Sequence, residues 1–287
     1  MAWNILRCII RSSRNTFQNR LFKNTVHINK IARSMSTIDS KEIEHFSTFK
    51  NDWWDKNGLH SDLHLYAPIR VKFVRDGLAN AGMQILNPAF PLEGVKIVDV
   101  GCGGGILTER LARIGAQVTG IDPSAELINV ANEHAKLDPD VAERLNYIYT
   151  TVEDFSRKKG ESYDAAVVSE VLEHVNNPQL FLKKCVKMIK PGGSIFITTE
   201  NRTLAAWSFI IATEYIFRRI PLGTHEWNKF ISPHEVQRIL DDCNCRTRLI
   251  HGMKMNPLLS HSKQWTWSSC TAIFYGLHAI KQKEIVM

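Results

Sequence analysis

The chain has 287 residues, of which 44% are apolar, and a formal net charge of +7. This length suits one large domain or two small ones, and the composition excludes disordered and fibrous proteins. The excess charge lies in residues 1–38, which hold seven basic residues and no acid, while the rest of the chain has 29 basic and 29 acidic residues. We therefore predict no nucleic-acid surface on the body of the protein.

Residues 1–38 have the composition of a mitochondrial transit peptide, because they lack acids and mix arginine with Ile, Leu, Phe and Ser. Arg7, Arg11 and Arg14 interrupt every apolar run that a secretory signal would need, and a disordered basic tail is the alternative. The cysteines form no CxxC pair and no zinc-ligand spacing, which suits a reducing compartment such as the matrix. No apolar run is long enough to predict a transmembrane helix.

Residues 39–94 predict a helical cap ahead of the sheet. The spacing of apolar residues indicates one helix over 39–51 and a second over 68–79. Two prolines in 87–94 mark the loop that leads into the first strand.

The segment 95–122 organises the rest of the chain. It predicts a buried strand (96–100), a turn with four glycines (101–105), a helix (107–114) and a second strand (117–121) that ends on Asp122. Glycine loses more backbone entropy on folding than alanine does, so four glycines in five positions need a local reason. We predict that a ligand lies against the backbone of this turn.

Two kinds of ligand use this arrangement. A dinucleotide site has glycines at positions one, three and six of its fingerprint, but position six counted from Gly101 is Ile106. The close spacing of Gly101, Gly103 and Gly105 suits a ligand that has no phosphates, and Asp122 can accept both hydroxyls of a ribose. Together these features resemble the S-adenosylmethionine site of the Rossmann-like methyltransferases, and a plain tight turn with a helix-capping Asp is the alternative.

After Asp122, strands and helices alternate, which predicts an α/β fold with a mainly parallel sheet. The further strands are expected at 146–150, 163–169, 194–199, 246–253 and 271–279, and the helices at 125–137, 178–189 and 235–241. A Pro-Gly-Gly sequence at 191–193 marks the end of the 178–189 helix. We predict one domain over 95–287 with a sheet of seven strands.

Residues 201–230 form an insertion after the fifth strand. It carries bulky apolar residues, namely Trp207, Phe209, Ile210, Ile211, Tyr215, Ile216 and Phe217, followed by Arg218 and Arg219. An apolar face with flanking arginines suits a helix that lies in the membrane interface. The alternative, compatible with the first, is that the insertion packs over the substrate pocket.

The strand over 163–169 ends at Ser169 and is followed by Glu170, Glu173 and His174. Ligands of open α/β sheets bind at this carboxyl edge, and one helical turn would bring the three side chains to one side. Two carboxylates and an imidazole suit either a hard-cation site or a general base, with Glu170 and His174 as the catalytic candidates. The alternative is that His174 only caps the following turn.

Several motifs together resemble the ubiquinone-biosynthesis O-methyltransferases over about residues 40–280. They are VDVGCGGGILTERLARIGAQVTGID, SEVLEHV, KPGG, TENRT, EYIFRRIPLGTHEWNKFI and MKMNPL. The resemblance implies a seven-stranded Rossmann-like sheet with helices on both faces and an antiparallel last strand. It also implies methyl transfer to a catechol hydroxyl of polyprenylated aromatic substrates, at the dihydroxybenzoate and demethylubiquinol stages.

The same resemblance implies roles for particular residues. Arg70, Gly101, Asp122 and Ser169 would contact S-adenosylmethionine, and Glu170, Glu173 and His174 would hold magnesium. Asp154 is a further candidate, for the adenine amino group. The insertion would contact the membrane, and the protein would belong to a multisubunit coenzyme Q assembly, bound peripherally to the matrix side of the mitochondrial inner membrane.

Two other functions agree less well with the sequence. A nicotinamide oxidoreductase would need the sixth-position glycine that the turn lacks. A non-catalytic scaffold would be expected to have lost site residues, whereas Gly101, Asp122, Glu170 and His174 are all present.

Overall fold

The computed structural model describes residues 37–58, 60–216, 224–256 and 264–283. The chain divides into two units, Met1–Thr37 and Ile38–Met287, and the elements all belong to the second. The predicted transit peptide therefore lies almost wholly outside the described residues, as do Phe217, Arg218 and Arg219 of the insertion.

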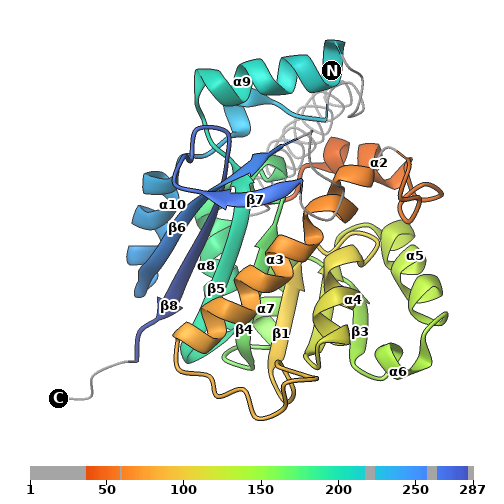
Figure 1. The fold of residues 1–287 in the computed structure, drawn as a ribbon, viewed down its shortest axis with the longest axis vertical. Coiled ribbons are helices and arrows are strands. Elements are labelled where there is room, and N and C mark those ends of the chain that lie inside the picture. The colour runs from red at the N-terminus through yellow and green to blue at the C-terminus, as the bar shows by residue number, and fades with distance from the viewer. Residues whose placement is uncertain (1–36, 59, 217–223, 257–263, 284–287) are drawn as a thin grey trace, which may run out of the picture. The chain divides into compact units, whose positions relative to one another are not determined.

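An eight-stranded sheet forms the centre of this unit, in the order β3-β2-β1-β4-β5-β8-β6-β7. The first five of these strands are parallel and the other three pair antiparallel. Their bounds are β1 Lys96–Val100, β2 Gln117–Asp122, β3 Leu145–Tyr149, β4 Tyr163–Ser169, β5 Ile189–Glu200, β6 Cys245–Met255, β7 Trp265–Ser268 and β8 Phe274–Lys281. The seven expected strands are present, and β7 is an additional edge strand (Figure 1).

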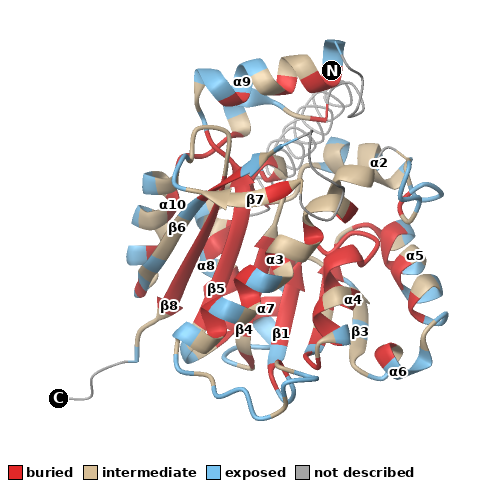
Figure 2. Ribbon diagram, in the orientation of Figure 1, coloured by how far each residue is buried: buried red, intermediate tan, exposed pale blue. Residues whose placement is uncertain are grey.

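Helices cover both faces because the central strands are apolar on both (Figure 2). Ile97 packs with residues of α3, α4 and α6, and its neighbour Val98 packs with α7, α8 and α10 on the opposite face. The helices are α3 Ser61–Asn80, α4 Ile106–Arg113, α5 Ala125–Ala135, α6 Pro139–Ala142, α7 Val152–Lys158, α8 Pro178–Met188 and α10 Pro233–Asp241.

The predicted cap has two helices, α2 (Ser40–Ser47) and α3. The side chain of Asp39 caps α2 by accepting a hydrogen bond from the backbone N–H of Lys41. The second helix is longer than expected, since it begins at Ser61 and continues through Pro68. Burial of the α3 face against the sheet and α4 outweighs the poor helix propensity of that proline.

The insertion folds into α9 (Leu204–Ile211), the π-helical turn η2 (Ala212–Ile216) and the 3-10 turn η3 (Trp227–Lys229). Thr203 caps α9 by accepting a hydrogen bond from the backbone N–H of Ala206. No helix among the described residues is both long and apolar enough to cross a membrane.

Other details of the prediction were wrong. The short helices α6 and α7 were missed, and the fifth strand begins at Ile189, so the Pro-Gly-Gly sequence at 191–193 lies inside β5. The start of β5 pairs with β4 through a register irregularity near Tyr163, which accommodates the proline and glycines that a regular central strand excludes.

Candidate functional site

The side chains predicted to act in binding or catalysis meet at the carboxyl edge of the parallel strands. The glycine turn follows β1, Asp122 ends β2, Ser169 and Glu170 stand at the end of β4, and Glu200 ends β5. Adjacent parallel strands bring these positions together, which is where ligands bind in open α/β sheets.

The glycine turn is enclosed by protein side chains. Gly103, at φ +54°, and Gly104 both lie against the indole of Trp53, and Trp54 donates a hydrogen bond to the carbonyl of Gly104 over 2.9 Å. A Cβ on Gly101 would lie 2.6 Å from Val171. The prediction that a ligand lies against this turn was therefore incomplete, because Trp53 of the cap and Val171 after β4 already occupy the space that side chains at these positions would need.

Asp122 fixes the turn to the end of β2. One of its carboxylate oxygens accepts the N–H of Gly103 over 2.9 Å, and the other accepts the N–H of Ser124 over 2.8 Å. Burial raises the pKa of Asp122 to about 6, although these two hydrogen bonds oppose the rise. The structure thus brings together two parts of the predicted ribose site, the glycine turn and the acid.

Arg70 and Ser169, predicted to contact the same ligand, are bonded to each other. Arg70 is 4% exposed on α3, and its Nη1 donates to the Ser169 hydroxyl while its Nη2 donates to the carbonyl of Leu63. Its Nε has no partner among the described residues. A buried N–H without a partner is costly, so this arginine is suited to an acceptor that a ligand supplies.

Three carboxylates, those of Glu170, Glu173 and Glu200, each place one oxygen within 4.8 Å of the other two. Thr198 donates to Glu170 and Thr199 donates to Glu173, each over 2.6 Å. One oxygen each of Glu173 and Glu200 is buried with no hydrogen-bond partner among the described residues. Oxygen donors in such a set fit a hard divalent cation.

The proximity of the carboxylates changes their ionisation. Burial, followed by the charge of Glu200, raises the pKa of Glu170 to about 7, and burial and the same charge raise the pKa of Glu173. The backbone of Glu170 has φ +55°, a conformation uncommon for a residue with a side chain. The turn that aims Glu170 at the cluster therefore carries some backbone strain.

His225 supplies the positive charge beside this cluster. Its Nδ1 lies 2.6 Å from an oxygen of Glu214, and its Nε2 lies 3.3 Å from an oxygen of Glu200. Burial alone would lower the pKa of His225, but the two carboxylates raise it to about 10. Glu200, His225 and Glu214 were not predicted as site residues, although Glu200 is an acid at the carboxyl end of a predicted strand.

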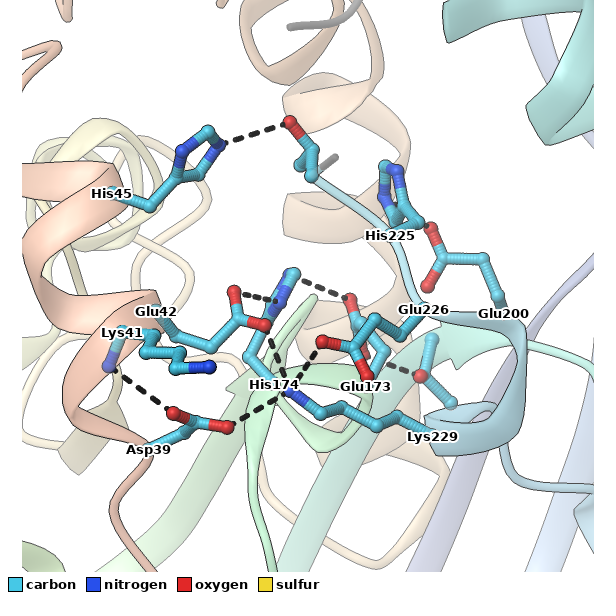
Figure 3. Close-up of polar contacts among 12 residues, drawn as sticks. Asp39, Lys41, Glu42, His45, Glu173, His174, Glu200, His225, Glu226 and Lys229 are labelled. Carbon is cyan, nitrogen blue, oxygen red and sulfur yellow. Dashed lines mark hydrogen bonds and ion pairs between the residues drawn. The ribbon is translucent and has the colours of Figure 1, made fainter. Parts of the chain in front are cut away.

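His174 faces a different partner from the one expected (Figure 3). It belongs to the 3-10 turn η1 (Leu172–His174), and its Nδ1 lies 3.1 Å from Glu42 of α2, whereas its Nε2 is 3.9 Å from Glu173. Glu42 also accepts a hydrogen bond from Lys229 over 2.9 Å. Burial would raise the pKa of Glu42, but His174 and Lys229 lower it to about 2.

Glu170 and Glu173 are thus brought together as predicted, with Glu200 in place of His174 as the third member of the group. The magnesium-binding role of these residues stays a prediction. Asp154 is exposed on α7, where it forms an ion pair with Arg157, and its role toward adenine stays a prediction.

Residues 98–197 match the methyltransferase domain family. The chain is 40% identical to the mitochondrial ubiquinone biosynthesis O-methyltransferase of Rattus norvegicus, over 96% of this chain and 79% of that protein. It is 41% identical to the mitochondrial human protein of the same name, over 87% of this chain and 67% of that protein. It is 42% identical to the ubiquinone biosynthesis O-methyltransferase of Chelativorans sp. (strain BNC1), over 86% of this chain and 95% of that protein.

Solved structures of methyltransferases share the fold. Magnesium protoporphyrin IX methyltransferase from Synechocystis PCC 6803 with bound SAH has a TM-score of 0.58 at 18% identity, covering 88% of this chain and all of that one. A possible histamine N-methyltransferase from Thermotoga maritima has a TM-score of 0.55 at 16% identity, covering 84% and 100%. At these identities the likeness shows the fold alone.

His225→Gln should lower the free energy of unfolding by about 3–5 kcal/mol, because it leaves Glu200 and Glu214 buried without their shared cation. Urea denaturation measures the loss, and His251→Gln, at an exposed position, is the matched control. Adding Glu214→Gln to the variant should recover part of the loss. A His225→Gln protein as stable as the control would contradict this view of the cluster.

Proposed function

The chain belongs to the ubiquinone biosynthesis O-methyltransferase family, and we propose that it methylates a catechol hydroxyl of polyprenyl-dihydroxybenzoate and of demethylubiquinol. It is an S-adenosylmethionine-dependent O-methyltransferase. The observation that carries the proposed substrate is the carboxylate cluster beside the glycine turn, since a metal held there suits the two neighbouring oxygens of a catechol. Methylation of a catechol by the purified protein with labelled methyl donor tests the proposal directly.

The residues around the glycine turn would orient the methyl donor. Asp122 would accept the ribose hydroxyls, and the free Nε of Arg70 would donate to the methionine carboxylate in a charge-assisted hydrogen bond. Both side chains are held by other hydrogen bonds, so little conformational entropy is lost when the donor binds. Such alignment matters because methyl transfer is an in-line displacement.

Glu170, Glu173 and Glu200 would hold magnesium, because their clustered carboxylate oxygens are the hard donors that this ion prefers. One oxygen each of Glu173 and Glu200 has no hydrogen-bond partner among the described residues and could bind the ion. A bound magnesium ion would act as a Lewis acid that lowers the pKa of the catechol hydroxyl. Burial, and after it the charge of Glu200, raises the pKa of Glu170 and of Glu173, and a bound divalent cation would stabilise their charged forms.

His174 would remove the proton of the hydroxyl. Glu42 can only accept a hydrogen bond, so Nδ1 of His174 donates to it. In the neutral imidazole, Nε2 would then have the lone pair that accepts the proton. As the phenolic oxygen bonds to the methyl carbon, the carbon–sulfur bond breaks, its electron pair stays on sulfur and the phenolic proton passes to Nε2. Glu42 would then stabilise the resulting imidazolium.

The protein would act in mitochondria at the matrix surface of the inner membrane. Several relatives are named as mitochondrial, and the insertion exposes Leu204 and Trp207 on α9 and Tyr215 and Ile216 on η2. These side chains, with 77% of Leu204 and 69% of Ile216 exposed, suit an interfacial helix. Membership of a coenzyme Q assembly stays a prediction that depends on the family resemblance.

Affinity for S-adenosylmethionine should fall as the pH drops below about 6. The raised pKa means that Asp122 becomes protonated below this value, and a protonated carboxyl accepts fewer hydrogen bonds. We expect calorimetry to show about tenfold weaker binding at pH 5 than at pH 7, with no further gain above pH 7. Asp122→Asn should bind at least about tenfold more weakly at pH 7 and lose this pH dependence. Unchanged binding by the variant would remove Asp122 from the site.

Glu200→Gln should weaken magnesium binding at least about tenfold, because it removes one charged oxygen ligand. Titration calorimetry with magnesium chloride measures the change, and Glu133→Gln, at a 71% exposed carboxylate, is the control. The wild-type protein should lose activity in excess chelator and regain it with magnesium. Full activity in chelator would discard the metal and leave His174 as the activating group.

Replacing the exposed apolar residues Leu204, Trp207 and Ile216 with serine should reduce flotation with liposomes that contain anionic lipid, because burial of these side chains drives interfacial binding. Leu137→Ser, at a 76% exposed position after α5, is the control and should float like the wild type. Equal flotation of the triple variant and the control would show that the insertion does not contact lipid.

A further inference from the structure

Four aromatic side chains from distant parts of the chain form a continuous row. Tyr66 of α3 lies 5.0 Å from Trp265 of β7, Trp265 lies 5.6 Å from Phe274 of β8, and Phe274 lies 5.4 Å from Phe209 of α9, measured between ring centroids. The rings meet at interplanar angles of 56°, 72° and 86°, so edges rather than faces are in contact. We call Tyr66, Trp265, Phe274 and Phe209 the aromatic row.

The inner end of the aromatic row lies at the candidate active site. The guanidinium of Arg70, which is bonded to Ser169, stands 4.2 Å from the centroid of the Tyr66 ring. Phe274 is paired directly opposite Glu200 in the β5–β8 ladder, so the row passes next to the carboxylate cluster.

The outer end of the row lies on α9, beyond β7 (Figure 1). Phe209 is half-buried in this helix, whose Leu204 and Trp207 are 77% and 48% exposed. The aromatic row therefore extends from the polar site to the helix that exposes these apolar side chains.

Two features distinguish the row from ordinary core packing. Tyr66, Phe274 and Phe209 each keep exposed surface, which a bound apolar chain would cover. Trp265 is 6% exposed, and its indole N–H has no hydrogen-bond partner among the described residues. Buried tryptophan N–H groups usually have an acceptor, so this donor indicates that a ligand supplies one.

We propose that the aromatic row holds the isoprenoid tail of the substrate and leads it from the catechol site to α9. This inference rests on the proposed function, because it assumes a catechol with a prenyl tail. The branched apolar units of such a tail would pack along the ring edges, and the N–H of Trp265 would donate to an oxygen of the aromatic head. The row would thus favour prenylated over tailless catechols.

Kinetics with matched substrates test the row. The purified full chain is assayed without lipid or detergent on a tailless catechol, a geranyl catechol and a farnesyl catechol, with labelled methyl donor. The wild type should show a higher kcat/KM as the tail lengthens. Phe209→Ala and Phe274→Ala should each reduce the farnesyl-to-tailless ratio of kcat/KM by about tenfold, which corresponds to ~1.4 kcal/mol.

Two further variants sharpen the comparison. Trp265→Phe keeps a ring but removes the N–H, so it should raise KM for the tailless and the farnesyl catechol by a similar factor. Leu137→Ala, at an exposed apolar position outside the row, should leave the ratio unchanged. Thermal unfolding of each variant identifies any that fail to fold.

A readout on the wild-type protein is independent of folding defects. A farnesyl catechol that carries a photoreactive diazirine at the tail end should label peptides of α9, β7 or the start of β8. Labelling confined to other elements would overturn the proposed row. So would an equal loss of kcat/KM for the tailless and farnesyl substrates in Phe209→Ala and Phe274→Ala. Failure to methylate any catechol would instead contradict the proposed function, so the two failures are distinguishable.

Discussion

The cost of gathering carboxylates away from water is the constraint on which the site depends. Two like charges 4 Å apart repel by roughly 4 kcal/mol at an effective dielectric constant of 20, which is a large fraction of the stability of a domain. Glu173 and Glu200 are almost fully buried, so the cluster persists only because its charge is opposed. His225 provides a buried cation, Thr198 and Thr199 provide hydrogen bonds, and the raised pKa of Glu170 allows a proton to be shared.

Buried ion pairs also hold the helical cap against the candidate site. Lys229 of η3 lies 3.0 Å from Asp39 and 2.9 Å from Glu42, and Glu42 in turn contacts His174 (Figure 3). The three carboxyl and amino groups are mostly buried, so solvent screens their attraction less than it would at the surface. A segment from the start of the folded unit and one from the insertion thereby determine the orientation of a side chain that follows β4. The orientation of His174 consequently depends on α2 and η3 as well as on its own turn after β4.

Local patterns in the sequence predicted the parts of the fold that are set locally. The strand Tyr163–Ser169 was predicted with its observed bounds, because its apolar run ends at a polar residue. The Glu200–His225–Glu214 contacts could not be predicted, since they join residues that no periodicity relates. The glycine turn was located correctly, but Trp53, almost 50 residues earlier, explains part of its composition. The spacing of the glycines in the sequence does not indicate their contact with Trp53.

Two regions of the fold lie on either side of the carboxylate cluster. The parallel sheet belongs to a fold that solved methyltransferases share at 16–18% identity. In the proposed function, the glycine turn and Asp122 at the edge of this sheet would bind the methyl donor. The strand β7 and the helix α9 lie on the other side of β5, where Trp265, Phe274 and Phe209 meet beside Glu200. In the proposed function the methyl donor would occupy the region of the glycine turn. The apolar part of the acceptor would then extend from the carboxylates toward β7, β8 and α9, where these aromatic side chains lie.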